Sequence, residues 1–315
     1  MSSISKSIRR TALDRKMDKI RALEESGKLG TKLTNRTLRK LMANKLAVFG
    51  AVMFVVICVL CFAAPLFTKW APGQISLRER MVGPGAEHLF GTDQMGRDIW
   101  SRMLYGGRIS IVVGLGSALG AALIGVSLGM FVGYKCGWLD ALILKISDVF
   151  LSFPQMVLII IIVALVGQSL QNMIIIFILT GWPSMYRMAR SKVLSLKEEE
   201  FVQALRAFGI SDLKIAFKHM LPNTVGPIVV NITLSTAMFI LQEASLSVLG
   251  YGVPQEIATW GNIINVITNA GVIRYDWLGY WWMWLPCAIM LILFVLSINF
   301  IGDGLRDASD PTQIG

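Results

Sequence analysis

The residues in this sequence that could perform chemistry are few, and their spacing favours neither catalysis nor metal binding. Only two histidines occur, His88 and His219, so no histidine-based metal cluster is visible. Cys58 and Cys61 have the CxxC spacing of zinc and redox sites, but they lie within an uncharged apolar run, where we interpret them as lipid- or core-facing residues. The run GLGSALG lacks the lysine of a phosphate-binding loop, and neither GxxxxGKS nor GxxxxGKT occurs in the chain. We therefore expect no cofactor and no metal in this chain.

Two carboxylates stand out because they lie toward the ends of apolar runs. Asp148 lies near the cytoplasmic end of one run, and Glu243 follows the start of another run at Thr224 by about 20 residues, or ~30 Å of helix. Carboxylates at such positions often line a water-filled path, so Asp148 and Glu243, together with Pro154 and Asn231, are our candidates for a translocation pathway. An acid that stabilises the following loop is an equally good interpretation of Glu243, and a packing kink is an equally good interpretation of Pro154.

The elements that must position these residues are membrane spans. The mean hydropathy is +0.61, 54% of the residues are hydrophobic and 16% are charged, which indicates a polytopic all-α membrane protein. Uncharged runs long enough to cross ~30 Å of hydrocarbon occur at Leu46–Phe67, Ile109–Tyr134, Val149–Gly167, Thr224–Gln242 and Leu278–Ile301. A sixth span is expected at Leu170–Arg190, with Arg187 and Arg190 reaching toward the interface. We thus predict six transmembrane helices.

The distribution of Lys and Arg predicts the orientation in the membrane. With the N-terminus in the cytoplasm, the inner segments hold 23 of the 30 Lys and Arg residues, so the positive-inside rule favours cytoplasmic N- and C-termini. Residues 1–45 form a basic cytoplasmic arm with 13 basic residues and four acids, which we expect at anionic lipid headgroups rather than on nucleic acid. Residues 303–315 form a cytoplasmic tail.

Residues 68–108 form an extracytoplasmic loop before a core of five further helices, 109–302. Thr92 or Asp93 is expected to cap a short interfacial helix that runs through Tyr105 and ends at Gly106–Gly107. Within the core, the second span contains the sequences GSALG, GVSLG and GMFVG. Small residues at this spacing allow close backbone approach, so we expect this helix in the middle of the bundle.

A charged loop, EEEFVQALRAFGISDLKIAFKHMLPN, separates the fourth and fifth spans and falls in the cytoplasm. Ser195 and Glu198 have the spacing of a capping box, which predicts a helix after Ser195, and Gly209 supplies the left-handed residue that ends it. Apolar side chains share one face of this helix at helical spacing, with Val202 beside them: Phe201, Leu205 and Phe208.

A second helix follows in the same loop. Ser211 or Asp212 can cap it, and Pro222 is expected to limit it before the fifth span. The apolar face of the first helix either rests on the membrane or on the inner ends of the spans, or docks into a groove of a cytosolic partner. Periodicity leaves both interpretations open.

This loop resembles the cytoplasmic coupling loop, here 195–222, of ATP-binding-cassette (ABC) importer permeases, which carries a Glu-Ala-Ala, Gly and Leu-Pro pattern. The matching residues are Ala204, Gly209, Leu221 and Pro222. Gln203 stands where the family usually has Glu, and Leu205 where it has the second Ala. Further stretches, GTDQMGRDIWSRMLYGGRIS, EASLSVLGYGVP and NFIGDGLRDASDP, resemble C-type permeases of the oligopeptide/dipeptide/nickel branch, over about Leu41 to Pro311.

The resemblance implies a type I ABC importer permease fold with a cytoplasmic coupling helix, and a transport subunit rather than an enzyme. It implies a second homologous permease, two cytosolic ATPases that bind ATP and Mg, and an extracytoplasmic solute-binding protein as partners. The residues it assigns to ATPase coupling are Glu200, Phe201, Ala204, Leu205, Phe208, Gly209, Ser211, Leu221 and Pro222. Short peptides are the implied solute, with nickel or metal chelates and glutathione-like solutes as alternatives, and an ion-gradient-driven transporter is the distant alternative.

Overall fold

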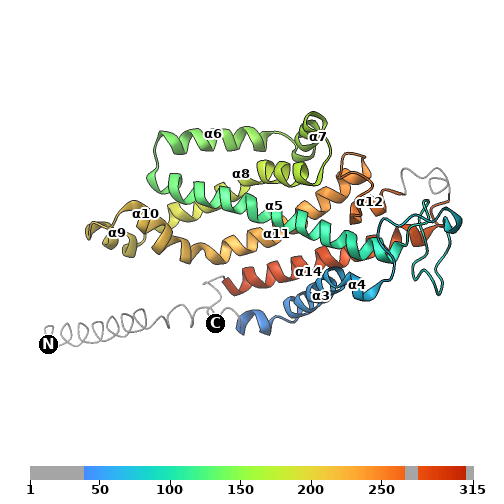
Figure 1. The fold of residues 1–315 in the computed structure, drawn as a ribbon. Helices are drawn as coiled ribbons and strands as arrows, with labels where there is room; N and C mark the ends of the chain where they lie inside the picture. Colours follow the sequence, from blue (N-terminus) through green and yellow to red (C-terminus); the bar gives the residue numbers. More distant parts are fainter. Residues whose placement is uncertain (1–38, 267–275, 310–315) are drawn as a thin grey trace, which may run out of the picture.

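Helices dominate the described part of the chain, residues 39–266 and 276–309, in this computed structural model (Figure 1). The longer helices are α3 (Lys45–Phe62), α5 (Ile99–Lys135), α6 (Trp138–Ser152), α7 (Gln155–Val166), α8 (Leu170–Lys197), α9 (Glu200–Ala207), α11 (Leu221–Val248) and α14 (Leu285–Ser309). The short ones are α4 (Ala64–Phe67), η1 (Leu77–Glu79), α10 (Asp212–Lys214), η2 (Ile215–Met220), α12 (Trp260–Ile264) and η3 (Trp281–Met283). Among these residues there is no β-strand, as expected for an all-α chain.

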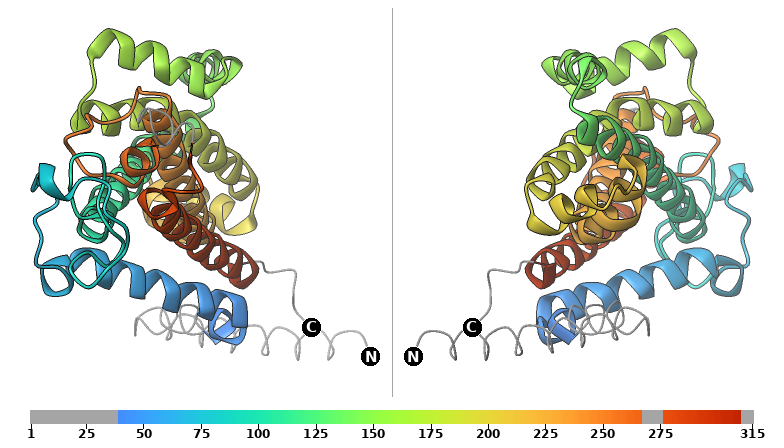
Figure 2. Two further views of the ribbon diagram at one scale, coloured as in Figure 1. Left: turned by 90° about the vertical axis from the view of Figure 1, so that its right-hand side faces the viewer. Right: turned by 90° about the vertical axis from the view of Figure 1, so that its left-hand side faces the viewer.

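Most of the long helices run back and forth along one axis, with α9 and α10 at one end of the bundle and α4 and α12 at the other, whereas α7 lies across it (Figures 1 and 2). The start of α3 lies against the last turns of α14, because a Cβ atom added at Gly304 would meet the side chains of Ala47 and Leu41. The two ends of the described chain therefore share one end of the bundle, as an even number of crossings requires.

Helix α5 begins ten residues earlier than the predicted span. Asp98 caps it by accepting a hydrogen bond from the Ser101 amide at 2.6 Å, so the expected cap at Thr92 or Asp93 and the separate interfacial helix are wrong. Gly106 and Gly107 do not end the helix. Instead they let other backbone and side chains approach, since a Cβ at Gly107 would lie 2.8 Å from the Trp260 ring.

Helix α5 packs closely against α8 at a row of glycines. A Cβ at Gly129 would lie 2.7 Å from the Cβ of Ala189 and 2.9 Å from the Arg190 amide nitrogen, and Gly125 and Gly133 meet α8 in the same way. The two helices run in the same direction along this contact. The close packing predicted from GVSLG and GMFVG is thus confirmed.

The third predicted span, Val149–Gly167, is wrong as a single helix. The chain passes along the bundle as α6, starting at Trp138, and then turns by 92° into α7 (Figure 1). Phe153 has extended backbone because a residue before proline is disfavoured in helical geometry, and Pro154 is the residue that directly precedes α7. Asp140 and Lys145 interrupt the apolar run in the sequence, which is why the start of α6 was missed.

Four helices of the described chain are long and apolar enough to cross a membrane: α3, α5, the continuous helix 212–248, and α14. The bent pair α6–α7 passes the same test when its two helices are taken together, which makes five candidate spans if the pair is one span. Helix α8 runs beside α5, but it does not meet the same criterion. It extends through Lys197, beyond the predicted end at Arg190.

The second loop helix does not end at Pro222. Helix runs without a break from Asp212 to Val248, because residues Ile215–Met220 adopt π-helical geometry, with the Leu221 amide bonded to the Ala216 carbonyl five residues back. Pro222 lies in the first turn after this segment, where a missing amide hydrogen is tolerated.

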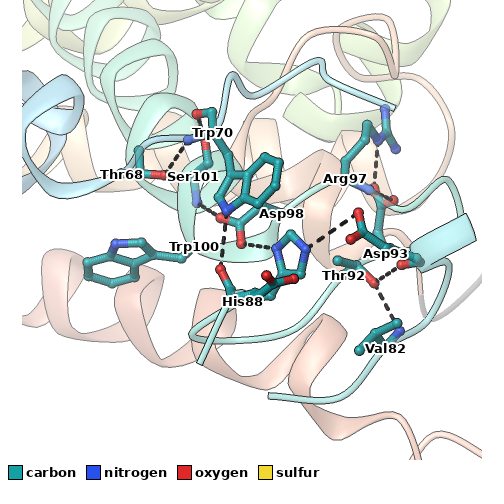
Figure 3. Close-up of polar contacts among 12 residues, drawn as sticks. Thr68, Trp70, Val82, His88, Thr92, Asp93, Arg97, Asp98, Trp100 and Ser101 are labelled. Carbon is teal, nitrogen blue, oxygen red and sulfur yellow. Dashed lines mark hydrogen bonds and ion pairs between the residues drawn. The ribbon is translucent and has the colours of Figure 1, made fainter. Parts of the chain in front are cut away.

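The outer loop folds into a polar cap over the end of α5 (Figure 3). The buried His88 ring stacks on Trp70 and shares a 2.8 Å hydrogen bond between its Nδ1 and Asp98. Beside it, Arg97 Nε donates to Asp93 at 2.6 Å. The cap residues are thus held by ionic and aromatic contacts of their own.

Several sequence-based predictions lie outside the described residues. These are most of the basic arm 1–45, which the structure describes from residue 39 only, the tail beyond Ser309, and the outer segment 267–275.

Candidate functional site

The charged loop between α8 and α11 forms a compact tip at one end of the bundle, built on helix α9. Val202 is fully buried there among Tyr134, Val193 and Met220, which come from α5, α8 and η2. Leu205 packs against the edge of the same cluster. Only part of the apolar face of α9 is therefore packed against the bundle, through Val202 and Leu205.

Tyr134, at the end of α5, also holds α9 through polar and cation–aromatic contacts. Arg206 Nε donates a 2.8 Å hydrogen bond to the Tyr134 hydroxyl, and its guanidinium lies over the same ring at 5.0 Å. The ammonium of Lys197 lies 5.6 Å from this ring as well. Such cation–aromatic contacts add to the burial of Val202, so α9 is fixed to α5 and can transmit a displacement to it.

Gly209 ends α9 with φ +73°, as predicted. The Gly209 amide bonds to the Arg206 carbonyl at 2.9 Å, and the Ile210 amide bonds to the Leu205 carbonyl at 3.2 Å. These two bonds form a Schellman motif, and the accompanying apolar contact joins Ile210 and Leu205 in the buried cluster. The turn thus sets the direction in which the chain leaves α9.

Large apolar side chains remain uncovered at this tip. Phe208 is 82% exposed, and Phe201, Leu213 and Phe217 are also exposed. Burial of an aromatic side chain of this size contributes about 1.5–3 kcal/mol, and exposed apolar groups that cluster together mark interaction sites. The tip can therefore bind an apolar groove of another molecule or a membrane surface.

The other residues assigned to coupling occupy both helices of the tip. Glu200 lies in the first turn of α9, and Ala204 is exposed on α9. Ser211 precedes α10, but its side chain makes no capping hydrogen bond. Leu221 and Pro222 begin α11 after the π-helical segment and lie beyond the tip itself.

The predicted capping box is wrong. Ser195 lies inside α8, which continues through Lys197, and α9 starts after Glu199, whose side chain makes no capping bond. The first turn of α9 is held instead by the Val202 and Gln203 amides bonding to the Glu199 carbonyl. The start of α9 is set by the burial of Val202 against α5 and α8, and not by the capping-box spacing of Ser195 and Glu198.

The four pathway candidates do not come together. Glu243 is fully buried inside the chain, accepting a 2.9 Å hydrogen bond from Ser247, while Ser110 beside it binds the Trp260 amide. Glu243 therefore faces no vestibule in this chain, and its geometry supports the interpretation that it stabilises the following loop. Asn231 donates to the Pro227 carbonyl of its own helix at 2.9 Å.

Asp148 and Pro154 lie on the exposed side of the bent pair α6–α7, and Asp148 forms an ion pair with Arg187 of α8. Because α6 begins at Trp138, Asp148 lies ten residues into the helix, about 15 Å along its axis.

Sequence reasoning missed the polar contact between α6 and α8. Asp140, buried on α6, accepts from Arg190 through both of its oxygens at 2.7 and 2.6 Å, and from the Tyr186 hydroxyl at 2.8 Å. A carboxylate between apolar stretches of a membrane chain indicates a partner on another helix, and this signal at Asp140 could have placed α6 beside α8. Across the described residues no group of histidines, cysteines and acids is arranged to hold a metal ion.

Comparison with known proteins agrees with this architecture. Residues 125–314 match the family model described as binding-protein-dependent transport system inner membrane component. Residues 32–84 match the model of the N-terminal TM domain of oligopeptide transport permease C, so this similarity reaches into the basic arm, which the sequence motifs had left outside.

Similar proteins extend over most of the chain. The dipeptide transport system permease protein of Alkalihalophilus pseudofirmus is 40% identical over 87% of this chain and 88% of its own length. A putative peptide permease protein of Brucella suis is 35% identical over 93% of this chain and 96% of its own length. Among solved structures, a chain of the methionine ABC transporter MetNI in inward-facing conformations matches with a TM-score of 0.50 and 21% identity, over 66% of this chain and 96% of that chain, which bears on the fold alone.

Proposed function

The chain belongs to the inner membrane components of binding-protein-dependent transport systems, as a C-type permease subunit with a type I ABC importer permease fold. From this premise we propose that it moves short peptides inward across the cytoplasmic membrane as part of an ATP-driven importer. The peptide class rests on the names of the similar proteins, several of which are dipeptide or peptide permeases. Nickel, metal chelates and glutathione-like solutes are the alternatives that a substrate screen distinguishes.

The observation that carries ATP coupling is the division of the α9 face. Val202 and Arg206 fix α9 to α5, while Phe201 and Phe208 remain free to enter a groove. Two cytosolic ATPases that bind ATP and Mg would supply this groove. Their closure would move the tip, and through Tyr134 and α5 it would switch the bundle between inward- and outward-open states.

The proposed assembly contains a second homologous permease, an extracytoplasmic solute-binding protein and surrounding membrane lipid. Both termini lie in the cytoplasm in this arrangement, since the basic residues concentrate on the end of the bundle that carries α9. The permease itself performs no covalent chemistry, and the solute-binding protein supplies the first selection of the solute.

Cross-linking at Phe208 tests the coupling. Phe208→Cys, in native membranes treated with a short thiol-reactive cross-linker, is expected to capture a nucleotide-hydrolysing subunit. Gln203→Cys, exposed on the same helix but on another face, is the matched control and is expected to capture less. Equal capture from both positions, or capture of lipid alone, would contradict docking through Phe208.

A gradient-driven carrier remains the alternative from another class. Such carriers use ionisable groups inside the membrane, and the ion pair between Asp148 of α6 and Arg187 of α8 is a candidate for that role. Uptake by the reconstituted assembly distinguishes the two: we expect uptake to require ATP and to persist after the proton gradient is collapsed. The opposite result would favour the carrier.

A further inference from the structure

Two ion pairs join α6 to α8, and they differ in exposure. The Asp140–Arg190 pair is enclosed, with only 6% of the Asp140 side chain exposed. The Asp148–Arg187 pair lies deeper along α6, yet 52% of the Asp148 side chain and 45% of the Arg187 side chain are exposed. The first pair, with Tyr186, already fastens the two helices, so an exposed second pair is not needed for that purpose.

The position of the exposed pair between apolar stretches limits what it can face. Asp148 lies about 15 Å along α6 from Trp138, and Arg187 follows Tyr186, whose amide meets Gly125 of α5. Charged groups within membrane-spanning helices are rarely in contact with hydrocarbon and almost always face a polar cavity or a polar partner. Ser152, four residues on and on the same side of α6, is exposed and polar, whereas Val149, about 100° further round the axis, is exposed and apolar and suits lipid. The side of α6 that carries Asp148 therefore suits a wet surface.

The break after Asp148 adds a second observation. Helix α6 ends at Ser152, and α7 leaves at 92° after Phe153 and Pro154. Discontinuous spans of this kind occur at solute sites of transporters, because irregular backbone inside a membrane is tolerated where it lines a cavity. The exposed ion pair lies within two turns of this break.

We propose that Asp148 and Arg187 form a contact point on the solute path that accepts zwitterions, with Arg187 receiving a carboxylate and Asp148 an ammonium group. This inference rests on the proposed function and specifies its solute chemistry. A guanidinium binds a carboxylate through two parallel hydrogen bonds, and an unmodified short peptide carries both required charges. Without solute the two side chains neutralise each other, so the path presents no net charge that would retain a single ion.

Exposure of this pair suits a transient contact. An ion pair that is about half exposed is weak, so a passing solute can open it with little cost and the pair can re-form behind it. The Arg187 side chain is steadied by Ser147, whose Oγ lies 3.5 Å from the Arg187 Nε.

Transport by the complete, reconstituted importer tests the proposal. The double variant Asp148→Asn with Arg187→Gln keeps the net charge and is expected to lower uptake of an unmodified dipeptide at least about tenfold. Lys145→Gln removes an exposed charge from the same helix and is expected to retain wild-type uptake. The same binding protein serves every variant, so the ratio to wild type isolates the permease. Unchanged uptake in the double variant, with normal uptake in wild type, overturns this inference and leaves the proposed function intact. Absence of dipeptide uptake in wild type would instead overturn the proposed function.

Thiol labelling gives an independent readout. In a chain with Cys58 and Cys136 replaced by serine, Asp148→Cys is expected to react with a membrane-impermeant thiol reagent, and saturating dipeptide is expected to slow the reaction. Val149→Cys, the exposed apolar neighbour, is expected to stay unlabelled. Failure of Asp148→Cys to react, or reaction that dipeptide does not slow, means that the pair faces lipid or the second permease and overturns the proposal.

Discussion

Replacement of Gly209 perturbs the direction of the coupling tip without a steric clash. The backbone at Gly209 has φ +73°, and a Cβ atom added there would meet nothing within 4 Å. The cost of a substitution is therefore conformational, about 1–2 kcal/mol for an ordinary L-residue, and at least as much for a β-branched residue. This range corresponds to a reduction of about 5–30-fold in the population of the native turn.

A graded series separates this effect from a general defect. Asparagine tolerates the left-handed region better than alanine, and valine tolerates it least, so the number of peptides carried per ATP is expected to fall in the order Gly209→Asn, Gly209→Ala and Gly209→Val. The assay measures ATP hydrolysis and peptide uptake in the same proteoliposomes. We expect ATP hydrolysis to persist while uptake declines, because the tip remains attached through Val202 but points in a wrong direction.

Gly137→Val serves as the matched control. Gly137 also faces open space, but its φ is −130°, which any residue adopts. It is expected to keep the wild-type coupling ratio. Normal coupling in Gly209→Val, or equal loss for asparagine and valine, would refute the argument that the left-handed turn directs the tip.

Two predictions concern the bundle itself and use the apparent melting temperature of the purified protein in detergent. Gly129→Leu is expected to cost about 1–3 kcal/mol and to lower the melting temperature by several degrees, because its Cβ would overlap Ala189 and the α8 backbone. Gly116→Leu projects into open space and is expected to change the melting temperature little. Equal effects of the two substitutions would contradict the close α5–α8 contact. Asp140→Asn leaves the Arg190 charge unpaired in the α6–α8 contact and is expected to destabilise the protein by about 2–4 kcal/mol. Asp148→Asn, in the half-exposed pair, is expected to cost less than about 1 kcal/mol. The reverse order would show that the enclosed pair does not hold α6 in place.

The parts of the fold that were predicted correctly rest on strong local signals. Glycines at four-residue spacing predicted close helix packing for α5, although not that α8 is the partner. Only a small residue fits there, because a Cβ added at Gly125 or Gly129 would lie 2.5–2.9 Å from atoms of α8. Gly209 predicted the end of α9 because a positive φ favours glycine. The family assignment followed from motifs that extend over most of the chain.

The errors arose where tertiary contacts override local signals. Gly106–Gly107 has the composition of a helix stop, yet α5 continues through it because Trp260 and the backbone near Thr259 fill the space beside these glycines. The start of α6 was missed because Asp140 and Lys145 lower the local hydropathy, and the partner that neutralises Asp140 lies 50 residues away on α8. The two interpretations of Glu243 stayed open in the sequence because its burial depends on Ser110, Ser247 and the loop after α11, which hydropathy does not reveal.

The π-helical segment Ile215–Met220 has a geometric consequence for the importer. One residue more than an α-turn requires is stored between α10 and α11, and in an α-helix each residue corresponds to a rotation of about 100° about the axis. If that residue moved into the neighbouring loop, the tip that carries Phe208 would rotate about the helix axis while α11 stayed in place. One inserted residue thus sets the rotation of the tip relative to α11.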